Sequence, residues 1–481
     1  MNPESEKRFR EAFGPLAIDK RRLPSSSLTR LGIPAYVAEW ILEEIVPGNG
    51  TLNEDELATL QKFTSQMLPR RNEQNVYRNR LLGGGTVSVL AFMNVEVDLT
   101  RTKQDRFARI PVLGFNDCWI SDAIVENNES LLRQGMWGII ELSRRDDGIE
   151  VIGFEPMQAS VNLKEFYNKR REFSDDEWRE LMVSSCGYNP SAYGVNEQVY
   201  MLCRLLPLVQ KNMHLMELAP KGTGKSFIYE NISPRVYLTS GNITPAVLFI
   251  NNATGQEGLL ARYDVVVIDE VQRIRLEYPE EIISNLKIYL ANGKIRRGGK
   301  ADIASDCALV MLANVPLSED LQPDTELLVQ SLPRFMHETA YLDRFRGIIP
   351  GWRIPKFRQD CVATGLGLKA DFFSDALTSM RFETHQDEWV RSVTTFPEKT
   401  TIRDQEAIIS IASGLVKILY PNLQLSTDSF VNFCLGPAIE LRQFVRDQLW
   451  QLDAEYRQTD KHLKASVLSA QELATNTDAL L

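Results

Sequence analysis

The sequence reads Ala219-Pro220-Lys221-Gly222-Thr223-Gly224-Lys225-Ser226 between the apolar run NMHLMEL and the segment FIYENI. This order predicts a strand, a loop and a helix. A loop of small residues lets backbone N–H groups surround phosphate oxygens, and the following helix presents its positive N-terminal end. Lys225 can reach the β- and γ-phosphates, and the Ser226 hydroxyl can ligate Mg²⁺. The eight residues therefore predict a binding site for ATP and Mg²⁺.

Position 219 departs from the usual pattern, in which the first residue of the loop is glycine. Alanine adds a methyl group and disfavours a positive φ. Gly222 and Gly224 remain, so we expect nucleotide binding to survive in weaker form. Taken alone, the motif also fits a glycine-rich turn without a ligand.

A second motif, YDVVVIDE at residues 263–270, is a continuous apolar run that ends in two acids. Such a run predicts a strand that is buried on both faces. Asp269 would then lie at the carboxyl end of the strand and hold Mg²⁺, largely through water. Glu270 would polarise the water that attacks the γ-phosphate. The alternative, a strand that ends in a solvated acidic turn, does not explain why both motifs occur in this order.

Three more residues fit AAA+ ATPases. The strand ALVMLAN ends at Asn314, where these proteins place an amide that positions the attacking water; a turn asparagine is the alternative. In YLDRFR, Arg344 is favoured over Arg346 as an arginine finger for the neighbouring subunit's site, against a surface salt bridge. Arg403 opens a helical segment and is expected to contact the γ-phosphate of its own subunit, or else is only solvated. A finger acting in trans requires a ring or stack.

The length of 481 residues predicts several domains. Helical and β-rich patterns come first, with Asn53 as a candidate helix cap. An alternation of strands and helices then predicts an α/β core with a parallel sheet, before a helical lid. The predicted parts are a helical segment at 1–70, a β-rich, barrel-like domain at 71–160, a helical connector at 161–195, the AAA+ P-loop core at 196–365, the lid at 366–460 and a polar tail at 461–481.

Composition narrows the class of protein. No apolar run is long enough to cross a bilayer, and the charged N-terminus lacks the apolar core of a signal peptide. We therefore expect a cytoplasmic protein without a membrane partner. The six cysteines and four histidines show no metal-ligand spacing, so no metal other than nucleotide-bound Mg²⁺ is expected. The net charge of −10 argues against a surface coated for nucleic acid but allows a local basic channel.

The chain resembles the BrxL family, Lon-related AAA+ proteins of bacterial BREX phage-defence systems. The likeness is carried by ELAPKGTGKSFIY, LKIYLANGKIRRGGK, YLDRFRGIIPGWRIPK and other segments between residues 215 and 360. It implies a role in anti-phage defence, with hexameric rings, single or stacked, that enclose double-stranded DNA, and other proteins of the BREX system as partners. The lid is similar to that of MCM helicases, which supports Arg403 as sensor 2.

Longer relatives in this family carry a Lon-like protease domain. Here Ala438 follows Leu435-Gly436-Pro437 where the nucleophile would stand. Pro437 more simply starts a helix. We therefore expect no peptidase activity from this chain.

Two basic sets are candidates for DNA contact. The first is a glycine-flanked hairpin, like the pore insertion of MCM-type rings, whose cations can follow phosphates without reading sequence. The second lies in a loop of the β-rich domain. Solvated charged turns are the alternative for both. The residues are Lys294, Arg296, Arg297 and Lys300 in the hairpin, and Arg101, Lys103, Arg106 and Arg109 in the loop.

Three functions share these motifs. The first is an ATP-driven, MCM-like motor that encircles DNA. The second is a protein unfoldase, for which the segment LLARY before the second motif is a poor pore loop. The third is a DNA clamp that uses ATP only for assembly. All three predict ATP hydrolysis, and the basic hairpin favours DNA over polypeptide.

Overall fold

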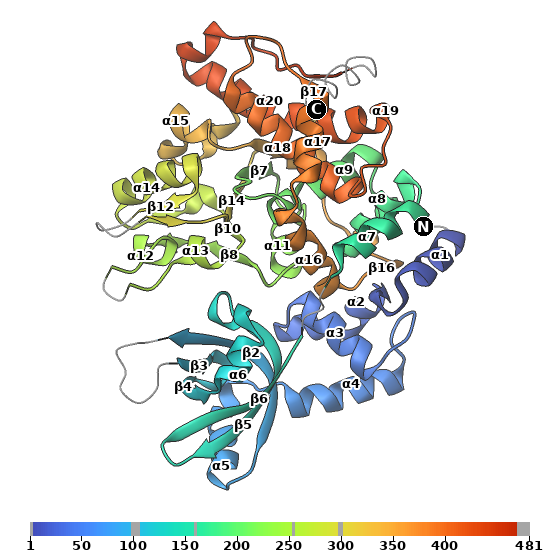
Figure 1. Ribbon diagram of the computed structural model, residues 1–481, viewed down its shortest axis with the longest axis vertical. Coiled ribbons are helices and arrows are strands. Elements are labelled where there is room, and N and C mark those ends of the chain that lie inside the picture. The colour runs from blue at the N-terminus through green and yellow to red at the C-terminus, as the bar shows by residue number, and fades with distance from the viewer. Residues whose placement is uncertain (1–2, 98–105, 158–160, 253–254, 297–301, 469–481) are drawn as a thin grey trace, which may run out of the picture.

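A five-stranded parallel sheet lies at the centre of the larger body of the protein (Figure 1). The computed structural model describes residues 3–97, 106–157, 161–252, 255–296 and 302–468. Every neighbouring pair of strands in this sheet is parallel, which confirms the predicted parallel sheet. In order across the sheet the strands are β15 (Gly347–Pro350), β7 (Leu215–Ala219), β14 (Ala308–Asn314), β10 (Val265–Asp269) and β8 (Val236–Ser240).

The apolar strands bury side chains on both faces of the sheet. In β10, Val265 and Val267 join one hydrophobic cluster, whereas Val266 and Ile268 join the other. Continuous apolar runs suit strands that are covered on both sides. The helices of this body are α9 (Val195–Cys203), α10 (Leu206–Val209), α11 (Lys225–Asn231), α12 (Pro245–Leu248), α13 (Leu259–Arg262), α14 (Pro279–Asn292) and α15 (Thr339–Leu342).

The helices after β15 pack onto the same body. Ile408 and Leu415 of α18 join the first cluster, and Val445 and Leu449 of α20 join the second. These helices therefore cover the sheet and are continuous with its core. Their bounds are α16 (Ala370–Ser379), α17 (His385–Val393), α18 (Ile402–Leu419), α19 (Thr427–Phe430) and α20 (Gly436–Leu452).

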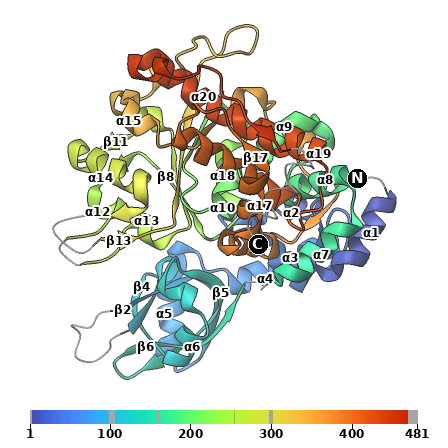
Figure 2. The same ribbon diagram turned by 45° about the horizontal axis from the view of Figure 1, so that its top comes forward.

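The β-rich part forms a closed five-stranded barrel with a core of its own. It lies below the sheet in Figures 1 and 2. Side chains of its first strand alternate between buried and more exposed positions over much of its length, as expected of a strand with one face on a core. The barrel strands are β2 (Val87–Val97), β3 (Arg106–Ile110), β4 (Phe115–Ile120), β5 (Met136–Arg145) and β6 (Gly148–Pro156), with α5 (Gln74–Leu82) and α6 (Asp122–Glu126) beside them.

The N-terminal residues pack on the ATPase body. Strand β1 (Ala17–Asp19) pairs antiparallel with β16 (Leu366–Leu368). Phe9 and Phe13 share a cluster with Trp178, whose indole N–H donates to the Ile418 carbonyl at 2.9 Å. Helix α1 (Pro3–Phe13) and residues 161–195 therefore contribute to one core, whereas α3 (Ala35–Ile45) and α4 (Glu54–Met67) belong to a separate cluster that also includes Leu90 of the barrel. The other helices of the predicted segments 1–70 and 161–195 are α2 (Arg22–Ser26), α7 (Leu163–Lys169) and α8 (Asp175–Ser185).

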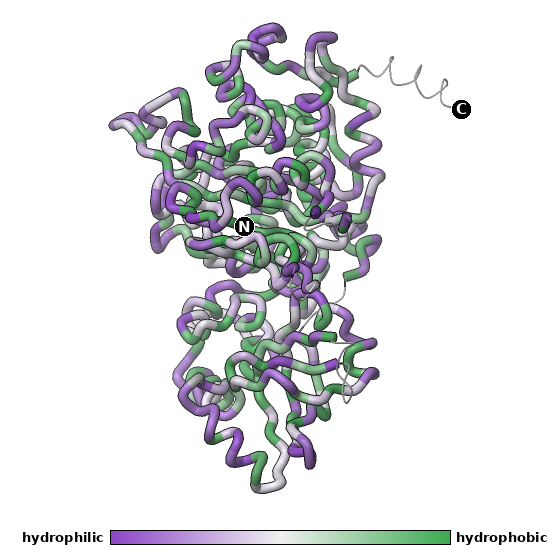
Figure 3. The backbone as a smooth tube through the Cα atoms, turned by 90° about the vertical axis from the view of Figure 1, so that its left-hand side faces the viewer, coloured by the Kyte–Doolittle hydropathy of each residue, from purple (hydrophilic) through white to green (hydrophobic). Residues whose placement is uncertain are grey.

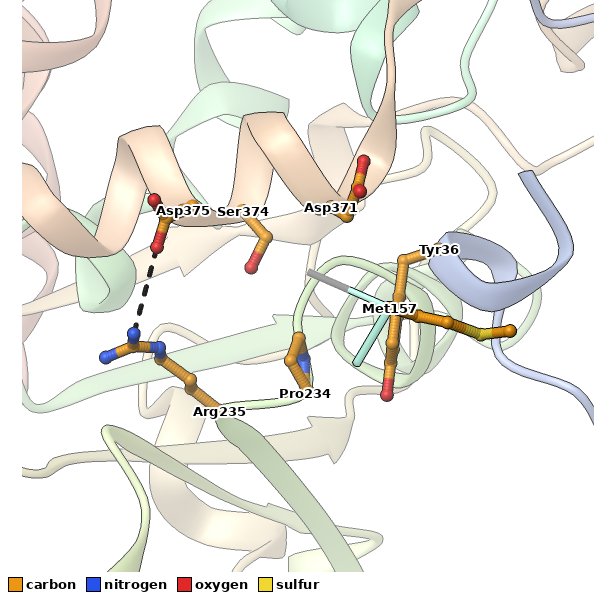
Figure 4. Close-up of a pocket in the computed structure, with 7 residues that line it drawn as sticks. All are labelled: Tyr36, Met157, Pro234, Arg235, Asp371, Ser374 and Asp375. Atoms are coloured by element: carbon orange, nitrogen blue, oxygen red, sulfur yellow. Dashed lines mark ion pairs between the residues drawn. The ribbon is translucent and has the colours of Figure 1, made fainter. Parts of the chain in front are cut away.

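Three parts of the chain meet at a small pocket (Figure 4). Tyr36 comes from α3, Met157 from the end of the barrel, and Asp375 from α16. Arg235, just before β8, lies 3.8 Å from the Asp375 carboxylate. The side view in Figure 3 shows the smaller barrel body beneath the larger one, and this pocket lies at their junction.

The remaining strands form short two-stranded pairs. They are β9 (Asn242–Ile243) with β11 (Arg275–Leu276), β12 (Lys294–Ile295) with β13 (Ile303–Ala304), and β17 (Thr394–Thr395) with β18 (Ser466–Val467). The last pair takes in part of the predicted polar tail, whose residues 469–481 lie outside the described residues. Within the described ranges no helix is both long and apolar enough to span a membrane.

Candidate nucleotide-binding site

The phosphate-loop motif forms the predicted strand, loop and helix. Strand β7 ends at Ala219, the loop occupies residues 220–224, and α11 begins at Lys225. Gly222 and Gly224 have φ angles of 83° and 73°. Both glycines therefore occupy the left-handed region that side chains disfavour.

The positive φ that alanine would disfavour at position 219 does not occur. Ala219 is the last residue of an extended strand and is not among the residues with a positive φ. Its side chain is fully buried. A Cβ atom placed on Gly351 would lie 2.4 Å from the Ala219 Cβ, so the absence of a side chain at Gly351 makes room for the methyl group. The backbone of the loop thus tolerates alanine at this position.

Four predicted polar residues meet at the carboxyl ends of three neighbouring strands. The Lys225 ammonium donates to Asn314 Oδ1 at 2.7 Å. The Ser226 hydroxyl donates to the Asp269 carboxylate. Burial lowers the pKa of Lys225, and the carboxylates of Glu217 and Asp269 oppose that shift. The edge of the sheet therefore brings a cation for phosphate next to two hard oxygen donors for Mg²⁺.

Glu270 stands immediately outside this group. It has a φ of 50°, in the left-handed region, and its N–H donates to Asp269 Oδ1 at 2.7 Å. Its side chain is 45% exposed, and Arg273 Nη1 lies 3.5 Å from one of its oxygens. This placement keeps a carboxylate accessible beside Ser226 and Asp269, as a group that polarises water requires.

A buried ion pair that the motifs did not predict contacts the phosphate loop from inside the protein. Arg204 and Glu217 are both fully buried, and Arg204 Nη2 lies 2.6 Å from Glu217 Oε1. The same nitrogen donates to the Thr223 carbonyl at 3.3 Å. The sequence carried one signal for this pair, because Glu217 is the only charged residue in the apolar run NMHLMEL.

Arg344 lies at the opposite end of the sheet. It precedes β15, and the N–H of Arg346 donates to the carbonyl of His214, just before β7, at 2.8 Å. Strand β7 has five residues, so its two ends are about 15 Å apart. Arg344 therefore stands at the amino ends of the strands, away from the phosphate loop of its own chain.

Arg403 lies at this same end, contrary to the expectation that it contacts the γ-phosphate of its own subunit. It forms an ion pair with Asp343. Arg442 Nη2 lies 2.6 Å from the other oxygen of Asp343. Burial is the largest single effect on the pKa of Asp343 and raises it. The two guanidinium groups act in the opposite direction and together outweigh burial, so the pKa lies below its usual value. The arrangement attaches the lid helices α18 and α20 to the segment that carries Arg344.

The described members of the basic hairpin differ in their surroundings. Strands β12 and β13 form its base. Lys294 is exposed, and Arg296 Nε lies 2.8 Å from the Asp302 carboxylate. Arg297 and Lys300 lie outside the described residues. An exposed pair of this kind is weak, so Arg296 stays available to a phosphate.

The two described basic residues of the predicted barrel loop, Arg106 and Arg109, form ion pairs within the barrel. Arg106 pairs with Asp122, and Arg109 Nη1 lies 2.7 Å from Glu96 Oε1. Glu96 Oε1 also accepts a hydrogen bond from Gln256 of the ATPase body at 3.3 Å. Arg101 and Lys103 lie outside the described residues. Arg109 thus belongs to a contact between barrel and ATPase body, which the sequence did not predict.

Comparison with known families gives two matches that together cover most of the chain. A family described as "Lon-like protease BrxL-like, ATPase domain" matches residues 149–462. A family described as "BREX system Lon protease-like protein BrxL N-terminal" matches residues 11–144. The boundary between them falls at the turn between β5 and β6, so the last barrel strand lies in the ATPase match.

Two curated relatives share this likeness. The "Lon-like protease BrxL" of Escherichia coli O9:H4 (strain HS) is 29% identical over 429 residues, which cover 87% of this chain and 61% of the relative. That of Bacillus cereus (strain H3081.97) is 30% identical over 429 residues, covering 87% and 62%. The chain therefore spans about three fifths of the length of these relatives. An uncharacterized protein, ORF426 of Acidianus filamentous virus 1, is 24% identical over 253 residues, covering 46% and 59%.

Proposed function

Because the chain belongs to the BrxL family, as its sequence motifs predicted, we propose that it is a ring-forming ATPase that encircles double-stranded DNA in bacterial anti-phage defence. The observation that carries the proposal is the meeting of Lys225, Ser226, Asp269 and Asn314 at one edge of the parallel sheet. This edge fits ATP with Mg²⁺. The opposite edge, with Arg344, fits the site of a neighbouring subunit.

The residues at the first edge divide the work of hydrolysis. Lys225 holds the β- and γ-phosphates, and Ser226 and Asp269 hold Mg²⁺, which supplies positive charge to the phosphates when bound. Glu270 orients the attacking water and accepts its proton. Asn314, which accepts a hydrogen bond from Lys225 at 2.7 Å, positions that water from the next strand.

The ring follows from the position of Arg344. Arg344 stands at the amino ends of the strands, and the phosphate loop follows the carboxyl end of β7, about 15 Å of strand away, so we assign Arg344 to a site on another subunit. A guanidinium group stabilises the charge that develops on the phosphoryl oxygens. Arg403 and Arg442 hold Asp343 and thereby fix the segment that carries Arg344. We propose a hexamer, single or stacked, as the assembly.

DNA is the proposed partner because of the hairpin at β12 and β13. Lys294 is exposed at its base and Arg296 is held only by a surface pair. Cations in such a position bind phosphates without reading sequence. The proposal extends to a cytoplasmic location, to other BREX proteins as partners and to no peptidase activity from this chain, in which Ala438 is buried in α20.

ATP hydrolysis with and without duplex DNA, at low and moderate salt, tests the proposal. Stimulation by DNA that fades as salt rises is the expected result, because phosphate contacts release counterions. Lys294→Ala with Arg296→Ala should lose this stimulation, whereas the control Lys399→Ala, at an exposed lid position, should keep it. Turnover that ignores DNA but rises with an unfolded polypeptide would replace the DNA proposal with an unfoldase.

A further inference from the structure

Two exposed aromatic rings border the phosphate loop. Phe227 directly follows Ser226 and is 41% exposed, and Phe357 is 38% exposed. Their ring centroids are 6.1 Å apart, and the ring planes are inclined by 30°. Exposed phenylalanine side chains cost free energy in water, so a stacked pair beside a ligand site requires an explanation.

The rings are attached to the loop by the backbone. The N–H of Phe357 donates to the Gly222 carbonyl at 2.7 Å. A Cβ atom placed on Gly224 would lie 3.8 Å from Cδ2 of Phe357. The rings therefore keep a fixed distance from the two glycines that shape the phosphate loop.

Tyr188 supports both rings from behind. Its ring meets Phe227 edge-on at a centroid distance of 6.3 Å and Phe357 at 5.9 Å. Its hydroxyl donates to the Gly224 carbonyl at 3.2 Å. Since Tyr188 is buried, it fixes one side of the pair and leaves the other side of the two phenylalanines accessible.

We propose that Phe227 and Phe357 form the platform on which the purine base of the nucleoside triphosphate stacks. The inference rests on the proposed function. If residues 220–226 hold the phosphates, the base lies within reach of the Phe227 ring, because Phe227 is the next residue in the chain. Stacking depends on the π-face of the base and not on its hydrogen-bonding edge. The platform therefore favours purines over the smaller pyrimidines and does not itself distinguish adenine from guanine.

The test compares ligands with and without a base. Binding of ATP and of inorganic tripolyphosphate, each with Mg²⁺, is measured by calorimetry on the full chain carrying Phe227→Leu, Phe357→Leu or Phe357→Trp. Leucine keeps apolar area but removes the π-face, so ATP binding should weaken roughly tenfold, while tripolyphosphate binding stays unchanged. Tryptophan should preserve ATP affinity. Phe382→Leu, at a 63% exposed position elsewhere, is the matched control.

The outcomes separate this inference from the proposed function. Unchanged ATP affinity in both leucine variants, with tripolyphosphate still bound, would overturn the platform and leave the ATPase intact. Equal loss of both ligands would show that the rings only shape the loop, which also overturns the platform. Loss of assembly with unchanged ATP affinity would assign the rings to a subunit contact. A wild-type chain that binds neither ligand would refute the nucleotide site itself.

Discussion

Ala219 and Gly351 share one space beside the phosphate loop. The methyl group of Ala219 occupies the volume that a side chain at Gly351 would need. The two positions therefore depend on each other, although 132 positions separate them, from 219 to 351. Single residues at this site act through such pairs: Lys225 with Asn314, and Ser226 with Asp269.

Gly351→Ala should destabilise the protein by about 1–3 kcal/mol through overpacking. The added Cβ atom would lie 2.4 Å from the Ala219 Cβ and 2.9 Å from Glu217 Oε1. Ala219→Gly in the same chain removes the first clash and should recover part of the loss. Urea unfolding of the two single variants and the double variant measures this, and strict additivity would contradict the shared space.

Glu270→Gln should lower ATP turnover by about 10²–10⁴-fold, because the amide cannot accept the proton of the attacking water. ATP affinity should remain, since the phosphate loop is untouched. Steady-state hydrolysis and equilibrium binding are measured on the same preparation, with the exposed Glu398→Gln as a control. Normal turnover in Glu270→Gln would remove this residue from its role.

His214 should make stability depend on pH. Burial, with Arg346 nearby, lowers its pKa to about 3, and its Nδ1 accepts from the Leu309 N–H at 3.1 Å. His214 thus stays neutral in the folded state at pH values where the same side chain in the unfolded chain, with a pKa of about 6.5, binds a proton. The contribution of neutral His214 to the free energy of unfolding is therefore complete above that pH. It is lost as the pH falls toward 3, by about 1.4 kcal/mol per pH unit.

His214→Asn keeps an acceptor near the Nδ1 position but does not titrate. Denaturant unfolding at several pH values between 5 and 8 should show a shallower decline below pH 6.5 for this variant. Parallel curves for the two proteins would show that His214 does not carry the effect.

At the scale of elements, strand β7 combines support and ligand binding. Its middle residue, Glu217, pairs with Arg204 inside the protein, and Arg204 also donates to the carbonyl of Thr223 in the loop. Strand β7 therefore fixes the start of the loop, because the loop directly follows its last residue. Through the ion pair it also fixes Thr223, near the end of the loop. Helix α9 and strand β7 act as one support, because Arg204 directly follows α9.

Arg204→Met should cost about 3–5 kcal/mol of stability, since it leaves the Glu217 carboxylate buried and unpaired. The double variant Arg204→Met with Glu217→Met removes both charges and should regain most of that stability. Its ATP affinity should stay several-fold weaker, because the Thr223 carbonyl has lost its donor. Thermal unfolding and ATP titration separate the two effects, and wild-type ATP affinity in the double variant would make the pair purely structural.

Sequence patterns predicted the elements that carry their own signal. The apolar runs at residues 265–269 and 308–314 predicted buried strands of the parallel sheet, and both are confirmed. The predicted cap at Asn53 is confirmed by its bond to the Glu56 N–H. The pair Arg204–Glu217 and the contact of Arg403 with Asp343 were not predicted. Arg204 and Glu217 are 13 positions apart and Arg403 and Asp343 are 60 apart, and only the folded chain shows that each pair is in contact.

At the scale of the whole molecule, the two edges of the sheet present different sets of charged residues, which in the proposed ring would complete one site between two subunits. The carboxyl edge holds Lys225 and Asp269, and the amino edge holds Arg344 with Arg403. The lid helices contact the amino edge through Arg442. A movement of the lid would therefore move Arg344 and Arg403 at this edge.

Arg344→Ala should reduce hydrolysis roughly a thousandfold, as expected for loss of an arginine finger. Mixing it with Glu270→Gln subunits should restore part of the activity, because each intact Glu270 can then meet an intact Arg344 from the other variant. Arg334→Ala, at an exposed position nearby, should stay active. No recovery in mixtures that assemble would argue against action in trans.

The pairing of β1 with β16 also concerns synthesis. Ala17 faces Leu368, so β1 leaves the ribosome about 350 residues before its partner exists. At 5–20 residues per second this delay lasts roughly 20 to 70 seconds. Throughout that time β1 lacks its partner strand, whereas the aromatic partners of α1, which are Phe166, Phe173 and Trp178, are already made within the first 180 residues. Strand β1 is thus made long before it can reach its native pairing, and the nascent chain must keep this strand unpaired during that time.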